Sequence, residues 1–277
     1  MQETRLLFII AKKKLNLSMK KIAVITPVYN GEKFIKDCFQ SVALSVVNGF
    51  TVEHIVVDDG STDNSWEIIQ KTRLPSLKTF RLDQNKGGSF ARNFAVKNTQ
   101  ADYLFCLDAD DVLFQNSLNH LFRFATKTQA DWVYGDFLRA NENLSYLPGQ
   151  DYYGSYFSTP AEVLISMFCG EHFFQGNCFF LRKTLLEVGA FDESIRIAED
   201  LDLFIRFALN GNVPVYLPGP LYLHRLHKNN TSRVLGRENN INEHKKDLAK
   251  LYQKYKQRLK NALGAKGIAK IEKTLLF

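Results

Sequence analysis

The sequence predicts an α/β fold: a Rossmann-like, mostly parallel sheet flanked by helices, with an amphipathic helical extension at the C-terminus. Three observations indicate this class. Short continuous apolar runs alternate with segments of helical periodicity, polar clusters follow the apolar runs, and apolar residues recur at helical spacing from residue 241 onward. Strands separated by helices of such length pair in parallel through right-handed crossovers. The chain of 277 residues is long enough for one large domain with an appendage.

The first half of the chain contains four expected strand-helix units. The expected strands are residues 22–28, 53–58, 77–82 and 103–107. The expected helices are residues 31–47, a segment capped within 61–63 that runs through Ile69, and residues 87–98 and 114–128. Continuous apolar runs of this length are typical of strands buried on both faces.

The alternation becomes looser after residue 130. Strands are expected at residues 132–137, 178–181 and 213–217, and a helix at 199–209. Thr159 and Glu162 have capping-box spacing, with Pro160 at the first helical position, which predicts a helix through Met167.

The chain divides into three expected segments. Residues 1–18 are expected to be an extension outside the fold, because Met19-Lys20-Lys21 before an apolar run reads like a natural chain start. Residues 19–230 form the domain, in halves of about 19–112 and 113–230, and residues 231–277 form a basic helical tail. The longest dense apolar run, Leu6–Ala11, is far shorter than the roughly 20 residues of a transmembrane helix.

Charge is unevenly distributed along the chain. The formal net charge is +7, yet residues 1–21 hold six Lys or Arg against one Glu, and residues 225–277 hold fourteen against four acids. The segment between is therefore acidic, with a net charge of −8. An acidic body with basic ends argues against a nucleic-acid-binding protein and fits a core that uses carboxylates while its ends meet an anionic surface. Solvated helix faces are the alternative explanation of the lysine runs.

The four cysteines indicate a reducing compartment. Cys38, Cys106, Cys169 and Cys178 show neither C-x-x-C spacing nor neighbouring histidines. Isolated thiols on apolar segments are usually small buried hydrophobes. We therefore expect a cytoplasmic protein, peripheral on the cytoplasmic face of the membrane if its basic tail meets lipid.

Polar clusters follow four of the expected strands, at the edge where open α/β sheets bind ligands. These clusters are Thr26–Gly31, Asp58–Ser61, Asn85–Gly88 and Asp108–Asp111. The last holds three carboxylates in four residues, so a cation or several donors must offset their repulsion. Oxygen ligands without Cys or His favour Mg²⁺ or Mn²⁺, completed by water and substrate phosphates. A solvated acidic turn that caps the next helix is the alternative.

The other three clusters fit a nucleotide site. Asp59 can accept a hydrogen bond from a base, with the turn Pro27–Asn30 as the opposite wall, although Asp-Gly is also ordinary turn chemistry. Gly87-Gly88 at a helix start lets backbone approach a phosphate, with Arg92 one turn further on. The segment 85–93 lacks the G-x-G-x-x-G and P-loop patterns, which disfavours a dinucleotide oxidoreductase and a P-loop ATPase.

A further group of carboxylates, within Ala198–Asp202, opens the expected helix 199–209. The helix dipole by itself favours carboxylates in a first turn. An ionised carboxylate on a rigid helix end, beside a metal–diphosphate site, is also what a general base for a hydroxyl nucleophile requires.

Taken together, these segments closely resemble the family 2 glycosyltransferases of the GT-A fold over about residues 20–230. The matching segments, in order, are Ile22–Asn30, Val56–Asp63, Asn85–Asn93, Asp108–Asp111, Glu199-Asp200 and Arg206. The resemblance implies an inverting enzyme of bacterial cell-surface type. It would transfer one sugar from a nucleoside diphosphate sugar, most often a UDP-sugar, to a hydroxyl of a glycan or lipid-linked glycan. The Q-x-x-R-W motif of processive synthases is missing, since the tryptophans are Trp66 and Trp132, which implies a non-processive enzyme.

The resemblance also implies residue roles on the donor side. Pro27, Tyr29 and Asp59 would form the base site, and Arg92 and Glu199 would lie at the nucleotide-sugar. The half 19–112 would then bind the nucleotide, and the half 113–230 the acceptor.

Four further roles concern the reacting groups. Asp108, also a donor-binding residue, and Asp110 would hold Mg²⁺ or Mn²⁺ at the diphosphate, with Asp110 the stronger candidate for direct coordination. Asp200 would be the general base. His227, in a late segment that includes Arg225, would contact metal or phosphate, unless it is a structural histidine.

Residues 141–180 hold ten aromatic side chains, twice the average density of the chain. The resemblance places the acceptor there, where Tyr146, Tyr152, Tyr153 or Tyr156 could stack on a sugar or contact a lipid carrier. The phenylalanines are expected to build core, because they have no polar tip to place.

The basic C-terminal helix has three explanations. It contacts anionic lipid, where each Lys or Arg near the surface contributes about 1 kcal/mol. Alternatively it packs onto the body, or it forms a homodimer through Leu248, Tyr255 and Leu259.

Two alternative functions share parts of the pattern. A sugar nucleotidyltransferase would need a glycine-rich basic loop after the first strand, whereas Thr26–Gly31 is followed by a first cation only at Lys33. A non-catalytic nucleotide-sugar-binding protein would bind the ligand without depending on Asp200 for turnover.

Overall fold

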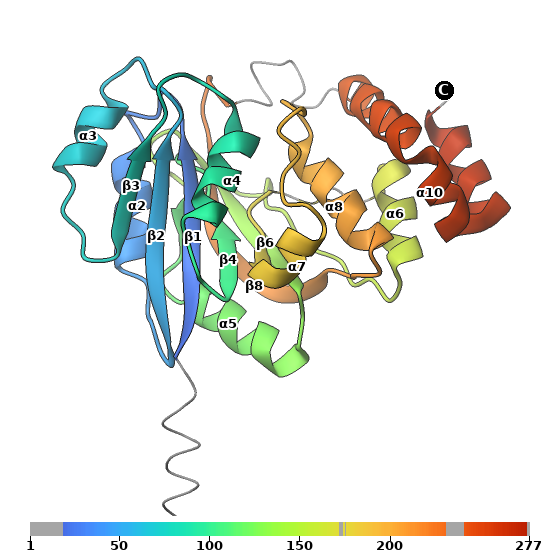
Figure 1. Ribbon diagram of the computed structural model, residues 1–277, viewed down its shortest axis with the longest axis horizontal. Helices are drawn as coiled ribbons and strands as arrows, with labels where there is room; N and C mark the ends of the chain where they lie inside the picture. Colours follow the sequence, from blue (N-terminus) through green and yellow to red (C-terminus); the bar gives the residue numbers. More distant parts are fainter. Residues whose placement is uncertain (1–18, 172–173, 175, 231–240, 276–277) are drawn as a thin grey trace, which may run out of the picture.

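The computed structural model describes residues 19–171, 174, 176–230 and 241–275, so the expected extension 1–18 lies outside the described residues (Figure 1). One sheet has the strand order β3-β2-β1-β4-β7-β6-β8-β5. Its strands are β1 (Lys20–Val28), β2 (Phe50–Asp58), β3 (Leu77–Arg81), β4 (Tyr103–Cys106), β5 (Val112–Leu113), β6 (Trp132–Asn141), β7 (Phe179–Leu181) and β8 (Val215–Leu226).

Helices cover both faces of this sheet. They are α2 (Ile35–Ala43), α3 (Ser65–Lys71), α4 (Gly88–Lys97), α5 (Ser117–Thr128), α6 (Pro160–Phe168), α7 (Arg182–Glu187), α8 (Glu199–Leu209) and α10 (Ile241–Leu275). Alternate residues of β1 face opposite sides because side chains alternate along a strand. Ala23 and Ile25 join the core that contains α4, α6 and α8, whereas Ile22 and Val24 join the core that contains α2 and α5.

The parallel pairing predicted for the first half is confirmed. β1 pairs in parallel with β2 and β4, and β2 pairs in parallel with β3. The second half is mixed, because β7 is antiparallel to both β4 and β6, and β5 is antiparallel to β8. The periodicity missed β5 and α7, which are too short to carry a pattern, and it ended β6 and β8 several residues early.

One predicted cap is wrong and another is confirmed. Helix α3 begins at Ser65 with Asn64 as its N-cap residue, not within residues 61–63. Ser61 and Asp63 accept backbone N–H groups of the loop after β1, and Asp63 also accepts the N–H of Ser65 at the start of α3. At α6, the Thr159 hydroxyl accepts the Glu162 N–H as predicted, and the Glu162 carboxylate accepts the N–H of Ser158.

The C-terminal helix packs onto the body. Figure 1 shows α10 at one end of the molecule, beside α6 and α8 and turned back on itself, with non-helical backbone at Gly264. Leu248, Tyr255 and Leu259 are buried in the core shared with these helices. The suggested homodimer through these three side chains is therefore wrong, because the body of the same chain already covers them. Residues 231–240 of the expected tail lie outside the described residues.

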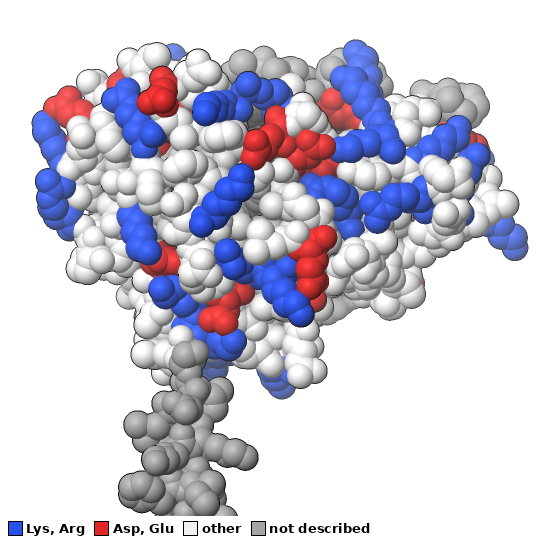
Figure 2. All heavy atoms as spheres, in the orientation of Figure 1, with Lys and Arg blue, Asp and Glu red and all other residues white. Residues whose placement is uncertain are grey.

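Among the described residues, no helix is both long and apolar enough to cross a membrane. Figure 2 shows Lys and Arg interspersed with Asp and Glu over the sheet domain, and Lys and Arg predominating over α10. The four cysteines are free thiols.

The Thr159 cap provides a test of this part of the fold. We expect Thr159→Ala to lower the free energy of unfolding by about 1 kcal/mol, because an orphan N–H at the start of α6 loses its acceptor. Urea unfolding followed by circular dichroism measures the change. Thr126→Ala is the matched control, since in the described part of the chain its exposed hydroxyl bonds only to carbonyls within α5. Equal stability of the two variants would contradict the cap.

Candidate functional site

The loops after β1 and β2 are joined at the carboxyl edge of the sheet. The Asn30 N–H donates to Ser61 Oγ at 2.9 Å, and Asn30 Oδ1 accepts the N–H of Thr62 at 2.8 Å. Asn30 adopts the left-handed conformation (φ 54°), which Asn tolerates better than most residues. This turn holds Tyr29 at the edge with half of its surface exposed, next to the half-buried Pro27 at the end of β1.

Asp59 fixes the loop that leads into α4. Its Oδ1 accepts the N–H of Lys86 and its Oδ2 accepts the N–H of Gly87, both at 2.7 Å. Asp59 is 2% exposed, so its carboxylate acts on the site mainly through this loop. Gly87 has φ 96°, and a Cβ there would lie 2.8 Å from Arg196 Nη1. The positive φ calls for glycine at this point, whereas the Arg196 guanidinium, at the end of a flexible side chain, could shift to admit a Cβ.

Arg92 joins three parts of the chain that are far apart in sequence. Its Nη2 donates to Asp108 Oδ1 after β4, and its Nη1 donates to Glu199 Oε1 at the start of α8, both at 2.9 Å. Burial lowers the pKa of Arg92, but the two carboxylates outweigh burial and raise it above its ordinary value. A planar guanidinium can serve two carboxylates at once, which a lysine ammonium cannot do in a fixed geometry.

Asp200 follows Glu199 directly and is half-buried. Its Oδ1 accepts the N–H of Leu201 at 2.8 Å, and among the described residues its Oδ2 has no hydrogen-bond partner. Burial, together with the neighbouring Glu199 carboxylate, raises the pKa of Asp200 to about 7. A carboxylate with a free oxygen and such a pKa is suited to accept a proton near neutral pH.

The three aspartates after β4 have different surroundings. The Asp108 side chain is 40% exposed. The partial withdrawal of its carboxyl group from water, together with the charges of Asp111 and Asp110, raises its pKa to about 6, although Arg92 acts in the opposite direction. Asp111 is buried and accepts from Asn177 Nδ2 at 2.6 Å and the Arg225 N–H at 3.0 Å, with His224 beside it. Donors therefore offset part of the repulsion that the sequence indicated.

His227 is held against Asp110. Its Nε2 lies 2.8 Å from Asp110 Oδ2, and its Nδ1 accepts the N–H of Asn229 at 3.2 Å. Because Nδ1 accepts, we assign the ring proton to Nε2, which donates to Asp110. Asn230 Nδ2 also donates to Asp110 Oδ2 at 3.1 Å. Both nitrogens of His227 are thus occupied by protein atoms, as in a structural histidine that orients Asp110.

Arg225 is buried, and its guanidinium holds the loop after β4 in place, a role the sequence did not indicate. Its Nε donates to the Asp110 carbonyl, its Nη1 to the Glu142 carbonyl and its Nη2 to Asp37 Oδ2, each at 2.8 Å. Because these bonds direct the guanidinium into the protein, Arg225 fastens the loop after β4 to α2 and β6. Asn177 was also missed, since a lone Asn carries no sequence signal.

The aspartates after β4 can hold a divalent cation only if substrate phosphates and water complete its coordination. Among the described residues, no three His, Cys, Asp or Glu side chains form a ready metal cage. Within that part of the chain, Asp108 and Asp110 each keep one carboxylate oxygen without a hydrogen-bond partner. Mg²⁺ is usually held in this way, by one or two carboxylates plus substrate phosphates and water. The residues present therefore fit a hard divalent cation shared with a diphosphate.

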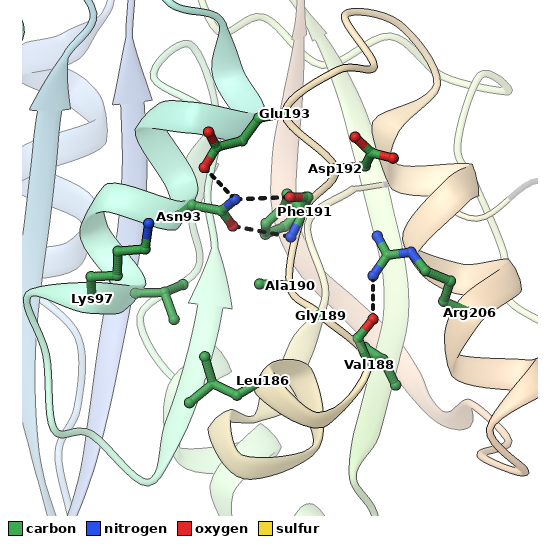
Figure 3. A pocket seen from close by; sticks show the side chains of 11 residues that line it. Asn93, Lys97, Leu186, Val188, Gly189, Ala190, Phe191, Asp192, Glu193 and Arg206 are labelled. Atoms are coloured by element: carbon green, nitrogen blue, oxygen red, sulfur yellow. Dashed lines mark hydrogen bonds between the residues drawn. The ribbon is translucent and has the colours of Figure 1, made fainter.

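A hollow of about 670 Å³ lies elsewhere, between α4, α7 and α8 (Figure 3). Its polar side chains bond to their neighbours: Asn93 pairs with the backbone of Phe191 and with Glu193, and Arg206 donates to the Val188 carbonyl. These bonds tie the segment before α8 to α4.

The structure thus brings the predicted residues together to different degrees. Arg92 bonds directly to Asp108 and Glu199, and Asp200 follows Glu199 in sequence. Asp110, two residues after Asp108, bonds to His227, which follows β8. Tyr29 and Asp59 lie at the ends of neighbouring strands, and Asp59 reaches the group through the loop that opens α4.

The chain is similar in sequence to known glycosyltransferases. Over 74% of its length the chain is 27% identical to "Glycosyltransferase GlyG" of Streptococcus pneumoniae serotype 4, covering 70% of that protein. It is 28% identical over 76% of its length to "Minor teichoic acid biosynthesis protein GgaA" of Bacillus subtilis, of which it spans about half, 48%. Both relatives are thus longer than the part this chain matches.

Solved structures with the same fold include TarS of Staphylococcus aureus. Its fragment 1–349 in complex with UDP-GlcNAc superposes with a TM-score of 0.63 and 23% identity, over 83% of this chain and 66% of that one. The model of the family described as Glycosyl transferase family 2 matches residues 23–189, which is more than half of the chain. The chain therefore belongs to glycosyltransferase family 2 and has the GT-A fold.

Proposed function

We propose that this glycosyltransferase moves a single sugar from a UDP-sugar to an acceptor hydroxyl with inversion at the anomeric carbon. The observation that carries the proposal is the Arg92 bridge, because it fixes the helix of Asp200 against the loop of Asp108 and Asp110. Family membership favours this function over a nucleotidyltransferase or a binding module. The UDP-GlcNAc bound by TarS, a protein of the same fold, supports the choice of a UDP-sugar donor.

The donor occupies the carboxyl edge of the sheet in this proposal. Tyr29 and Pro27 line the base site, and Asp59 shapes it through the backbone of Lys86 and Gly87. Asp108 and Asp110 hold Mg²⁺ or Mn²⁺ at the diphosphate. When bound, such an ion supplies Lewis-acid stabilisation of the charge on the leaving diphosphate. Arg92 holds Asp108 in place, and His227 with Asn230 holds Asp110.

Asp200 removes the proton from the acceptor hydroxyl while that oxygen attacks the anomeric carbon from the face opposite the diphosphate. The bond to the diphosphate breaks as the new glycosidic bond forms, so one base and one displacement suffice. A positioned base of this kind contributes roughly 10²–10⁴-fold to the rate. The pKa of Asp200, about 7, lets the same carboxyl accept the proton and release it to water afterwards near neutral pH.

The acceptor in this proposal is a glycan or lipid-linked glycan of the bacterial cell envelope. GgaA, a relative named for minor teichoic acid biosynthesis, supports an envelope polymer. Exposed tyrosines lie in the acceptor half, at Tyr146, Tyr153 and Tyr156. The Lys and Arg side chains that predominate over α10 would face an anionic lipid surface that carries such an acceptor.

Substituting the proposed base tests the function. We expect Asp200→Asn to lower kcat by about 10²–10⁴-fold, while the dissociation constant for UDP changes less than about threefold. UDP release assays give kcat, and isothermal titration calorimetry gives the affinity. Glu187→Gln is the control, since it neutralises an exposed carboxylate on α7. Turnover of Asp200→Asn at the level of this control would refute the assignment.

The raised pKa of Asp200 predicts an acidic limb in the rate profile. A base must be ionised to accept a proton, and the raised value keeps Asp200 protonated at higher pH than an ordinary aspartate. We expect kcat to fall about tenfold per pH unit well below pH 7 and to level off above it. Rates from pH 5 to 9 at saturating donor test this. A flat profile between pH 5.5 and 8 would contradict the prediction.

The cation proposal is tested by binding alone. We expect UDP to bind at least about tenfold more tightly with Mn²⁺ than with EDTA, and Asp110→Asn to remove most of that difference. Calorimetry with UDP measures both affinities. Glu67→Gln, an exposed substitution on α3, should retain the full metal effect. Equal affinity of the unmodified protein in Mn²⁺ and EDTA would remove the metal role of Asp108 and Asp110.

A further inference from the structure

Asp202 forms a buried polar link between α8 and the C-terminal helix. It lies two residues after Asp200, and its side chain is 0% exposed. Its Oδ1 accepts Lys254 Nζ at 2.6 Å and the Tyr255 hydroxyl at 2.7 Å, both from α10. Its Oδ2 accepts the Nε–H of Arg206 at 2.8 Å, and Arg206 Nη2 lies 2.7 Å from the same oxygen as an ion pair. Three hydrogen bonds to one buried carboxylate, two of them from α10, define the position of this turn of α8 closely.

Lys254 also holds the segment that precedes α8. Its Nζ lies 2.7 Å from Asp192 Oδ2 and 2.6 Å from Asp202 Oδ1. The hydrogen bond from Lys254 is the main cause that lowers the pKa of Asp192 below its ordinary value. One ammonium group therefore spans both ends of the segment 192–202.

The segment between these two ends carries the proposed base and is conformationally constrained. Ala198, two residues before Asp200, is in the left-handed region (φ 63°), which costs a non-glycine residue roughly 1–3 kcal/mol. Such a conformation persists only when its surroundings fix it. On the α4 side, Asn93 bonds to both backbone groups of Phe191 (Figure 3). On the other side, the fixing contacts come from α10.

We propose that Lys254 and Tyr255 are positioning residues, which hold the start of α8 so that Asp200 meets the acceptor hydroxyl. The family model ends at residue 189, so this link lies outside the part of the chain that it matches. The inference rests on the proposed function, because it concerns the base assigned there. It makes α10 part of the catalytic unit as well as a cover for the core.

The double variant Lys254→Met/Tyr255→Phe tests this role. Arg206 still pairs with Asp202 in that variant, so the buried carboxylate is not left bare. We expect kcat to fall about 10- to 100-fold, because small displacements of a reacting group cost that much, with the dissociation constant for UDP within about twofold. Tyr252→Phe is the matched control: it removes a tyrosine–carboxylate bond, to Glu272, within α10 itself. Lys254→Arg with Tyr255 retained should keep most of the activity.

A double-mutant cycle separates positioning from general damage. In the Asp200→Asn background, we expect the same double substitution to cause little further loss of kcat, because the group that it positions is already missing. If the double variant unfolds, Tyr255→Phe alone, which keeps the Lys254 ion pairs, is put through the same cycle. A kcat equal to that of Tyr252→Phe, or a full additional loss on top of Asp200→Asn, would overturn the inference. Full turnover by Asp200→Asn itself would instead overturn the proposed function.

Discussion

The two-sided hydrogen bonding of Arg92 is the constraint on which the rest of the site depends. A parallel sheet puts the ends of β1, β2 and β4 at one edge, but it says nothing about α8, which comes about ninety residues after β4 in sequence. The guanidinium on α4 supplies that connection, with one side on Asp108 and the other on Glu199. Arg92 is therefore the fixed point between the donor loops and the proposed base.

Around this point, carboxylates divide into those that build the edge and those that remain free to react. Asp59 and Asp111 are buried, with their oxygens bonded to backbone and side-chain donors. Asp108, Asp110 and Asp200 each keep one oxygen without a partner in the described part of the chain. The acidic residues in the middle of the sequence thus serve two purposes, since some hold loops in place and others remain free to react. Their hydrogen bonds in the fold distinguish the two groups.

The sequence predicted the parts of the fold that rest on periodic burial, and it failed where pairing depends on distant partners. The runs at β1, β2 and β4 and the cap at Thr159 have local causes, so they were predicted correctly. A strand was also expected at β7, but its antiparallel direction was not, because a run of three residues carries no sign of direction. Asp200 was singled out as the base by the family resemblance, and that role stays a prediction, whereas Asn177 and Arg225 gain their roles only from contacts with Asp111, Asp110 and Asp37.

The C-terminal helix shows that a run of basic residues does not by itself predict which partner each side chain contacts. Its basic residues suggested a surface that meets lipid, yet Lys254 is directed at Asp192 and Asp202, and its apolar stripe is covered by the same chain. Lys254 and Tyr255 make two hydrogen bonds to a buried carboxylate on α8, where a hydrophobic contact would stabilise the packing as well, so we attribute this polar link to the geometry of that helix. The polar link therefore specifies where α8 begins, and so where Asp200 lies.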